Sequence, residues 1–400
     1  MVVGHPLTLL NLALWVLEGN GLLGALEPFS LVSALTVFGG VLSGLMGRIF
    51  KWLPSTALEL LLGVVFGGAT GWHPSNLLTV LAAGVGLFLL MANSGYEAGE
   101  EVVANHLRIG VKLAVVGAIC ALALTFTSSE IFGFGNKVSL LLGIAAAPTS
   151  VGIATRSFYQ LGLLKTKIAS LVLSVAVIDD LVGIALLLAG EVFIVSAGGR
   201  GSIKILLASL LPPTVLLILI KLFPSAKGAD PVFKGALVGG MILISAVAMV
   251  ASGSIVVVGF AFGTALAIFG VSAQWSAVKA LWKGTEYLSP LFFFLAGDSA
   301  TVTHPGMSTF LSFLAVVVGV IISRLIVVYV GRRVLSDWII FAASLLPRGE
   351  VTLVVLLAGV TAGIVNQPTY LGGVGAVLVT SIVSPVVLSA RQSSFHEEGS

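Results

Sequence analysis

Residues 170–186 read SLVLSVAVIDDLVGIAL, an apolar run with two adjacent acids, Asp179 and Asp180, at its centre. With its apolar flanks, this run reaches the length of about twenty residues that a helix needs to cross the hydrocarbon core of a membrane. A carboxylate at that depth is costly unless it is paired or hydrated, so intramembrane acids mark functional sites. The pair therefore predicts an ion or proton site inside a membrane protein.

The composition of the whole chain also indicates a membrane protein. Hydrophobic residues make up 58% of the 400 residues and charged residues only 9%, whereas a soluble protein carries about a quarter charged residues. Apolar runs of membrane-spanning length recur along the chain. We therefore predict an all-α polytopic protein embedded in a lipid bilayer.

The distribution of reactive side chains argues against an enzyme. All five histidines fall in predicted loops or termini, so no span holds a histidine general base or a histidine metal site. The single cysteine, Cys120, cannot form an internal disulfide or a cysteine metal cluster. We expect no catalytic activity, no cofactor and no nucleic-acid partner.

Apolar runs separated by polar breaks predict about thirteen transmembrane helices. They lie near residues 30–47, 53–71, 77–95, 112–130, 138–157, 168–190, 205–222, 235–252, 254–270, 286–303, 309–330, 338–363 and 370–390. An earlier run at 7–17 is too short to span a bilayer, so residues 1–29 are predicted to form an interfacial N-terminal segment. The polar residues 391–400 are predicted to form a disordered tail.

Basic residues are unevenly divided between the two sides of this topology. Of the 20 Lys and Arg residues, 15 lie in alternate connections on one side, and only Lys137, Arg200 and Lys204 lie in the opposite connections. The side rich in Lys and Arg is cytoplasmic by the positive-inside rule. The N-terminus is therefore predicted outside and the C-terminus in the cytoplasm, which requires an odd number of spans.

The two adjacent acids cannot have the same surroundings. Neighbouring residues of a helix point about 100° apart, so one carboxylate can face a water-filled cavity while the other faces a neighbouring helix. Arg324 lies inside the run 309–330 and keeps its proton, so it needs a buried anion. We predict that Asp179 pairs with Arg324 and that Asp180 faces the cavity, where it can exchange a proton for a cation such as Na⁺.

A proline interrupts the span that precedes the acids. Residues 143–152 read GIAAAPTSVG, with Pro148 inside the apolar run. Proline frees a backbone carbonyl, and non-helical backbone at membrane depth supplies oxygen ligands for a hard cation. We expect the chain around Thr149 and Ser150 to contribute to cation binding.

A second interruption lies near the C-terminus. Residues 345–351 read LLPRGEV and break the span 338–363 with Pro347, a glycine and two opposite charges. Arg348 and Glu350 are predicted to neutralise the facing half-helix ends and each other.

The two interrupted spans occupy equivalent positions in two groups of three. The groups are 112–130, 138–157 and 168–190, and then 309–330, 338–363 and 370–390. The basic residues make the first spans of the two groups start on opposite sides of the membrane. This arrangement predicts inverted-topology repeats with two crossed broken helices that form the site.

Several motifs together resemble a known family. They are Pro148-Thr149-Ser150, Arg156, Leu161-Gly162-Leu163, Val177-Ile178-Asp179-Asp180, Pro54-Ser55-Thr56-Ala57-Leu58-Glu59, Gly95-Tyr96-Glu97, Pro290-Leu291-Phe292-Phe293-Phe294 and Pro347-Arg348-Gly349-Glu350-Val351. The combination covers about residues 50 to 390 and resembles the monovalent cation/proton antiporter superfamily. It is most similar to the Asp-Asp branch of bacterial sodium/proton antiporters.

This resemblance implies that different parts of the chain form different domains. Residues 112–190 and 309–390 would form the core ion-transport domain, with 30–95 and 205–270 as dimerisation helices and 286–303 as a linking helix. Asp180 would bind Na⁺ and H⁺ in turn, with oxygens around Thr149 and Ser150 as further ligands. The resemblance also implies a homodimer in a bacterial-type inner membrane.

The sequence departs from the Asp-Asp branch at one position. The branch usually carries lysine where this chain has Arg324. A lysine can release its proton when its partner is disturbed, whereas an arginine cannot. We therefore predict that one proton is carried per cation and that transport is electroneutral or nearly so.

Two alternatives to sodium/proton exchange stay open from the sequence. The same machinery could carry K⁺ or an organic cation against H⁺, because one acid and a few oxygens select charge better than size. A different class is a sodium-coupled organic-anion symporter on a related fold. The charged pair Arg348 and Glu350 at the second interruption argues against that class, which needs polar sodium ligands there.

Overall fold

The computed structural model describes most of the chain beyond residue 53. The described residues are 54–70, 77–103, 107–160, 162–163, 166–195, 231–250, 254–272, 275–300, 305–333 and 337–397, with isolated positions between 207 and 218 and at 335. The predicted segment 1–29, the predicted span 30–47 and most of the span 205–222 lie outside them.

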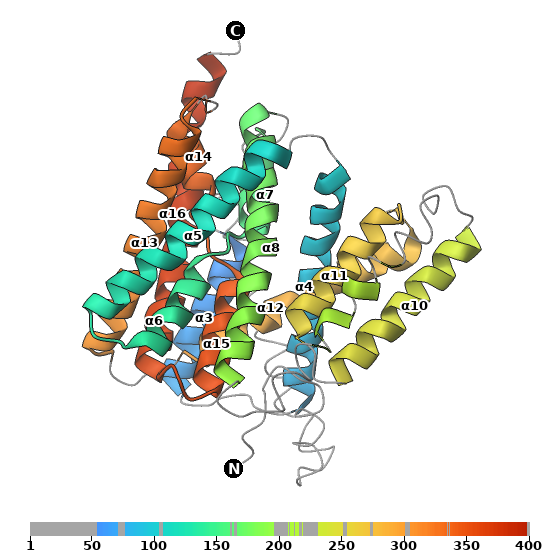
Figure 1. Ribbon diagram of the computed structural model, residues 1–400, viewed down its shortest axis with the longest axis horizontal. Helices are drawn as coiled ribbons and strands as arrows, with labels where there is room; N and C mark the ends of the chain where they lie inside the picture. The colour runs from blue at the N-terminus through green and yellow to red at the C-terminus, as the bar shows by residue number, and fades with distance from the viewer. Residues whose placement is uncertain are drawn as a thin grey trace. The chain divides into compact units, whose positions relative to one another are not determined.

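The described residues form thirteen helices and no strand (Figure 1). The helices are α3 (Ser55–Thr70), α4 (Leu77–Val103), α5 (Leu107–Ile131), α6 (Asn136–Ala146), α7 (Val151–Gln160), α8 (Lys167–Val195), α10 (Pro231–Val250), α11 (Ile255–Ile268), α12 (Ser276–Asp298), α13 (Met307–Gly331), α14 (Trp338–Ser344), α15 (Glu350–Thr361) and α16 (Gln367–Glu397). Two pairs, α6 with α7 and α14 with α15, are the halves of interrupted spans.

These helices agree with a polytopic membrane protein. Six spans are long and apolar enough to cross a bilayer: Thr79–Gly99, Ile109–Ile131, Asn136–Tyr159, Lys167–Gly190, Met307–Gly331 and Gln367–Arg391. With the half-helices joined, every predicted span inside the described residues has a counterpart. The predicted all-α class and both interruptions are confirmed.

The contacts between helices divide the chain into two compact units. Unit 1 holds α4, α10, α11 and α12 up to Phe292, and unit 2 holds α3, α5 to α7, α8 up to Leu187, the end of α12, and α13 to α16. All of the candidate site residues therefore lie in unit 2.

Unit 1 is built around a close pair of helices, α4 and α11. Gly263 of α11 lies against the Ala92 carbonyl of α4, and a Cβ at residue 263 would overlap that carbonyl. Beside this contact the Tyr96 hydroxyl donates a hydrogen bond to the carbonyl oxygen of Val271 at 3.0 Å. The absence of a side chain at residue 263 is therefore what lets the two backbones approach.

Unit 2 is built around α13, which packs against both α5 and α16 (Figure 1). The half-helices join this bundle through contacts of α6 with α5 and of α15 with α6. Gly183 of α8 lies beside the ring of Pro148, so the helix that carries the two acids passes next to the first interruption.

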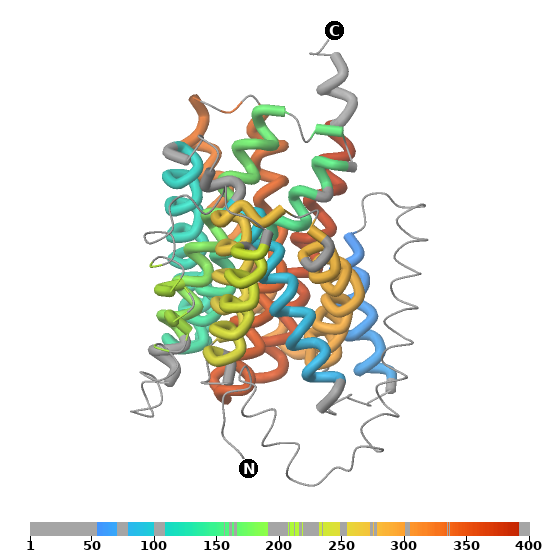
Figure 2. The backbone as a smooth tube through the Cα atoms, turned by 90° about the vertical axis from the view of Figure 1, so that its right-hand side faces the viewer, coloured from blue at the N-terminus to red at the C-terminus, as the bar shows by residue number. Residues whose placement is uncertain are grey.

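Two segments add to the sequence prediction. The role of the span 53–71 as a dimerisation helix stays a prediction, but its helix α3 belongs by its contacts to unit 2 and lies beside the end of α12 (Figure 2). Gly63 of α3 lies against the Phe294 carbonyl. Residues 391–397 were predicted to be part of a disordered tail, but they belong to α16, which ends at Glu397. No glycine or proline occurs between Pro385 and Gly399, so no residue there stops the helix.

Candidate functional site

The two interruptions meet each other inside unit 2. Residues 147–150 separate α6 from α7, and residues 345–349 separate α14 from α15. The backbone N–H of Ser150 donates a hydrogen bond to the carbonyl oxygen of Pro347 at 3.0 Å. Backbone polar groups that the prolines remove from the helices are thus partly satisfied by the opposite interruption.

Asp179 and Arg324 form the ion pair that the sequence predicts. Nη1 of Arg324 lies 3.1 Å from Oδ2 of Asp179, and both side chains are almost fully buried. Nη2 of Arg324 also donates to the carbonyl oxygen of Ala147 at 3.4 Å, at the end of α6. The guanidinium lies beside Gly117 of α5, where a larger residue would collide with it. Each of these two buried charges would be strongly destabilising without the other.

Thr149 connects this ion pair to the second interruption. Its hydroxyl donates to Oδ2 of Asp179 at 2.6 Å and accepts a hydrogen bond from Nη1 of Arg348 at 3.0 Å. A hydroxyl has one proton to donate, and here that proton is committed to Asp179. Thr149 was predicted as a cation ligand, but in the structure its hydroxyl links Asp179 to Arg348 and so connects the two interruptions.

Arg348 is fully buried in the interruption that follows α14. Its Nη1 also donates to the carbonyl oxygens of Leu345 and Pro347, both at 3.3 Å. A cation stabilises the carbonyl end of a helix, so this part of the prediction for Arg348 agrees with the geometry.

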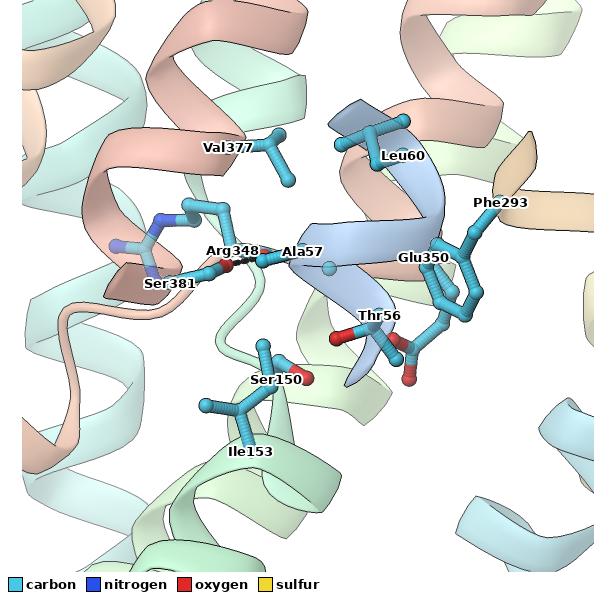
Figure 3. Close-up of a pocket in the computed structure, with 11 residues that line it drawn as sticks. Thr56, Ala57, Leu60, Ser150, Ile153, Phe293, Arg348, Glu350, Val377 and Ser381 are labelled. Carbon is cyan, nitrogen blue, oxygen red and sulfur yellow. Dashed lines mark hydrogen bonds between the residues drawn. The ribbon is translucent and has the colours of Figure 1, made fainter. Parts of the chain in front are cut away.

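Arg348 and Glu350 are not in direct ionic contact among the described residues, so their mutual neutralisation stays a prediction. Figure 3 shows the guanidinium pointing toward Ser381 and the Glu350 carboxylate pointing the other way, toward Thr56. The physical reason is that the residues flank Gly349, where irregular backbone gives way to α15, so their side chains leave the chain in different directions.

Asp180 follows Asp179 in α8 and points about 100° away from it around the helix axis. It is 2% exposed and lines a narrow pocket together with residues 148–150 and 349–352. Glu350, in the first turn of α15, lines the same pocket. Both interruptions and Asp180 therefore contribute to one cavity.

Sequence reasoning missed three residues that shape this site. Thr352 lines the pocket, Ser381 of α16 donates to the carbonyl oxygen of Arg348 at 2.9 Å, and Gly117 provides space for Arg324. A polar residue two positions after Glu350 in an apolar span was a usable signal for Thr352. Single small residues in long apolar helices give no such signal for the other two.

The arrangement can hold one small cation or a proton at a buried carboxylate. Asp179 is engaged by an arginine and a hydroxyl, while Asp180 lies at the cavity beside irregular backbone. Oxygen atoms at the interruption of membrane helices are ligands for hard monovalent cations. Groups of three or more acids, histidines or cysteines, as a tightly held metal ion would need, do not occur among the described residues.

Comparisons with known proteins agree with this chemistry. A Na(+)/H(+) antiporter of Enterococcus hirae is 24% identical over 375 residues, which cover 90% of this chain and 95% of that protein. The Na(+)/H(+)-K(+) antiporter GerN of Bacillus cereus is 25% identical over 382 residues, covering 90% and 94%.

A solved structure shares the fold. The sodium proton antiporter MjNhaP1 of Methanocaldococcus jannaschii superposes with a TM-score of 0.64 and 16% identity, covering 92% of this chain and 97% of that one. Residues 33–390 match the family described as sodium/hydrogen exchanger, transmembrane. Since that match takes in nearly the whole chain, this protein belongs to the sodium/hydrogen exchanger family.

Proposed function

We propose that this chain exchanges a monovalent cation, Na⁺ or Li⁺, for H⁺ by alternating access, with Asp180 binding the two ions in turn. The observation that carries the proposal is the asymmetry of the two acids. Asp179 is held by Arg324 and Thr149, whereas Asp180 lines the cavity at the crossing of the broken helices.

The charges around the cavity favour exchange of one cation for one proton. Three acids lie there, Asp179, Asp180 and Glu350, with two arginines, Arg324 and Arg348. With all five ionised the cluster carries one net negative charge. A single Na⁺ or a single H⁺ makes it neutral, and neither arginine can release a proton. The exchange is therefore electroneutral.

Potassium is the second candidate cation. The relative GerN from Bacillus cereus, which matches this chain over 94% of its length, is named as an Na(+)/H(+)-K(+) antiporter. The pocket binds through one or two carboxylates and a few oxygens, which define charge more strongly than ionic radius. A sodium-coupled symporter is not proposed, because the relatives that span the chain are exchangers.

We further propose the membrane context of this exchange. The uneven distribution of basic residues supports a cytoplasmic C-terminus and an external N-terminus. Two relatives that match along nearly their whole length come from bacteria, which supports an inner membrane of the bacterial type. The helices of unit 2 are the candidates for the ion-transport domain, and those of unit 1 for the scaffold of a homodimer.

The direct test is proton flux in proteoliposomes with an imposed pH gradient. Adding Na⁺, Li⁺ or K⁺ to the wild-type protein should release protons, with Na⁺ or Li⁺ active at the lowest concentration. Asp180→Asn should abolish the exchange, because the amide cannot take up a proton. Asp337→Asn is the matched control: Asp337 only caps α14, where asparagine also serves. Exchange at the wild-type rate by Asp180→Asn would overturn the proposal.

A further inference from the structure

We propose that Glu350 and Thr352, at the start of α15, are direct ligands of the exchanged cation and form a second wall of the site opposite Asp180. This inference rests on the proposed exchange function and assigns two of its ligands. It changes the role of Glu350 from a charge that balances Arg348 to a group that binds the transported ion.

The first support is the position of these residues. The pocket that Asp180 lines from α8 is also lined by residues 349–352. Gly349 brings this wall close, because its backbone lies where an added Cβ would be only 2.8 Å from the Ser150 hydroxyl oxygen. The beginning of α15 is thus pressed against the first interruption, and both line the cavity.

The second support is the Thr352 hydroxyl, which is 1% exposed and has no hydrogen-bond partner among the described residues. A threonine inside a helix usually donates to the carbonyl three or four positions earlier. Thr361 does so in the same helix, toward Leu357 and Ala358. The corresponding carbonyl for Thr352 is that of Arg348, which accepts the Ser381 hydroxyl instead.

A buried hydroxyl without a partner is costly, and a bound cation would supply the missing partner. The oxygen of Thr352 can coordinate a cation through its lone pairs, as the carboxylate oxygens of Asp180 and Glu350 can. Only the carboxylates can also take up a proton. The hydroxyl is therefore a ligand for the cation alone, and this difference gives the proposal a specific signature.

The charge of the pocket fits a monovalent ion. Two carboxylates line it, and the described residues offer no third acid within a metal-binding group. Arg348 lies nearby, and the amino end of α15 adds partial positive charge at Glu350. Arg348 and the helix end together offset one of the two carboxylate charges, and one bound cation neutralises the remaining charge.

A purely structural role for Glu350 predicts different behaviour. An acid in the first turn stabilises a helix through its dipole, so loss of that role would lower the melting temperature and leave the affinity for cation unchanged. Direct ligation instead predicts a change in the apparent KM for cation. The two roles are therefore separable by measuring both quantities.

The experiment compares Na⁺-dependent and Li⁺-dependent exchange in proteoliposomes for the wild type, Thr352→Val and Glu350→Gln, at several pH values. Thr361→Val is the matched control, because it makes the same substitution in the same helix at an exposed residue that bonds only to its own helix. The melting temperature of each purified protein is measured alongside.

Thr352→Val should raise the apparent KM for cation by roughly threefold to tenfold, the effect of losing one polar ligand, with an unchanged maximal rate and pH profile. Glu350→Gln should raise the KM further and also alter the pH profile, because one proton acceptor is removed. Thr361→Val should behave as the wild type. A wild-type KM in both Thr352→Val and Glu350→Gln, while Asp180→Asn is inactive, would overturn this inference alone. Absence of cation-dependent exchange in the wild type would overturn the proposed function with it.

Discussion

Arg324 is the residue that fixes the charge of the site. Its guanidinium holds Asp179 at 3.1 Å and reaches the Ala147 carbonyl at the end of α6. In the proposed mechanism, this permanent positive charge favours the ionised form of Asp179, so that Asp179 does not carry a second proton. The electroneutral stoichiometry that we propose depends on this one side chain.

Replacing Arg324 by lysine tests that argument. A lysine can release its proton when a cation or proton disturbs its partner, so Arg324→Lys should allow a second proton to be carried per cycle. We expect exchange to persist, at a reduced rate, and to become electrogenic with one net charge moved per cation. Transport currents on supported membranes, compared with those of the wild type, measure the change.

Arg332→Lys is the control for this prediction, since Arg332 is an exposed arginine at the end of the same helix and packs over the ring of Tyr329. The Arg332→Lys protein should, like the wild type, produce no transport current. A wild-type protein that already produces a strong current would contradict the electroneutral stoichiometry. An Arg324→Lys protein that exchanges without current would contradict the role given to the arginine.

At the level of elements, the crossing of the two interruptions depends on small residues at its closest point. Gly349 faces Ser150, and a Cβ at residue 349 would lie 2.8 Å from the Ser150 Oγ and 2.9 Å from its Cβ. The same approach allows the hydrogen bond from the Ser150 N–H to the Pro347 carbonyl. A methyl group inserted here has to push the two interruptions apart.

Gly349→Ala should therefore reduce both stability and exchange. We expect a loss of about 1–3 kcal/mol in the free energy of unfolding, as for overpacked cores, and a marked fall in exchange rate as the pocket is distorted. Gly152→Ala is the control, because an added Cβ there meets no atom within 4 Å and alanine favours the helix α7. Thermal unfolding and proton flux of the two proteins give the comparison. Equal behaviour of both would mean that the close approach is not required.

The interruptions themselves could be predicted from the sequence, whereas the contacts that surround them could not. Proline together with glycine, hydroxyls or charges inside an apolar run marks both Pro148 and Pro347. The Asp179–Arg324 pair could also be predicted, because a buried arginine needs an anion. The direction of the Arg348 and Glu350 side chains could not, since it depends on irregular backbone that no helical periodicity describes. The Thr149 bridge likewise depends on tertiary packing.

At the level of the whole molecule, the sequence predicts the positions of the described spans better than their grouping into units. Apolar length and the distribution of basic residues are properties of single segments, so they can be read along the chain. Membership of α3 in unit 2 rests instead on contacts such as Gly63 with the Phe294 carbonyl, between residues far apart in sequence. A glycine in an apolar run does not indicate which other helix will pack against it.

The direction of the chain in the membrane is open to a labelling test within unit 2. Lys137, at the start of α6, and Arg333, after α13, are both exposed and lie in connections assigned to opposite sides. Because the side with more basic residues is cytoplasmic, Lys137→Cys should be external and Arg333→Cys internal. Both variants are made with Cys120→Ser, which removes the single native cysteine.

In intact cells a membrane-impermeant maleimide should label Lys137→Cys and leave Arg333→Cys unlabelled. After permeabilisation both should be labelled, which controls for accessibility of the thiol itself. The reverse pattern in intact cells would contradict the predicted topology and would place the C-terminus outside. It would leave the proposed chemistry unchanged, because the binding of one cation or one proton at Asp180 does not depend on which side of the membrane each ion enters from.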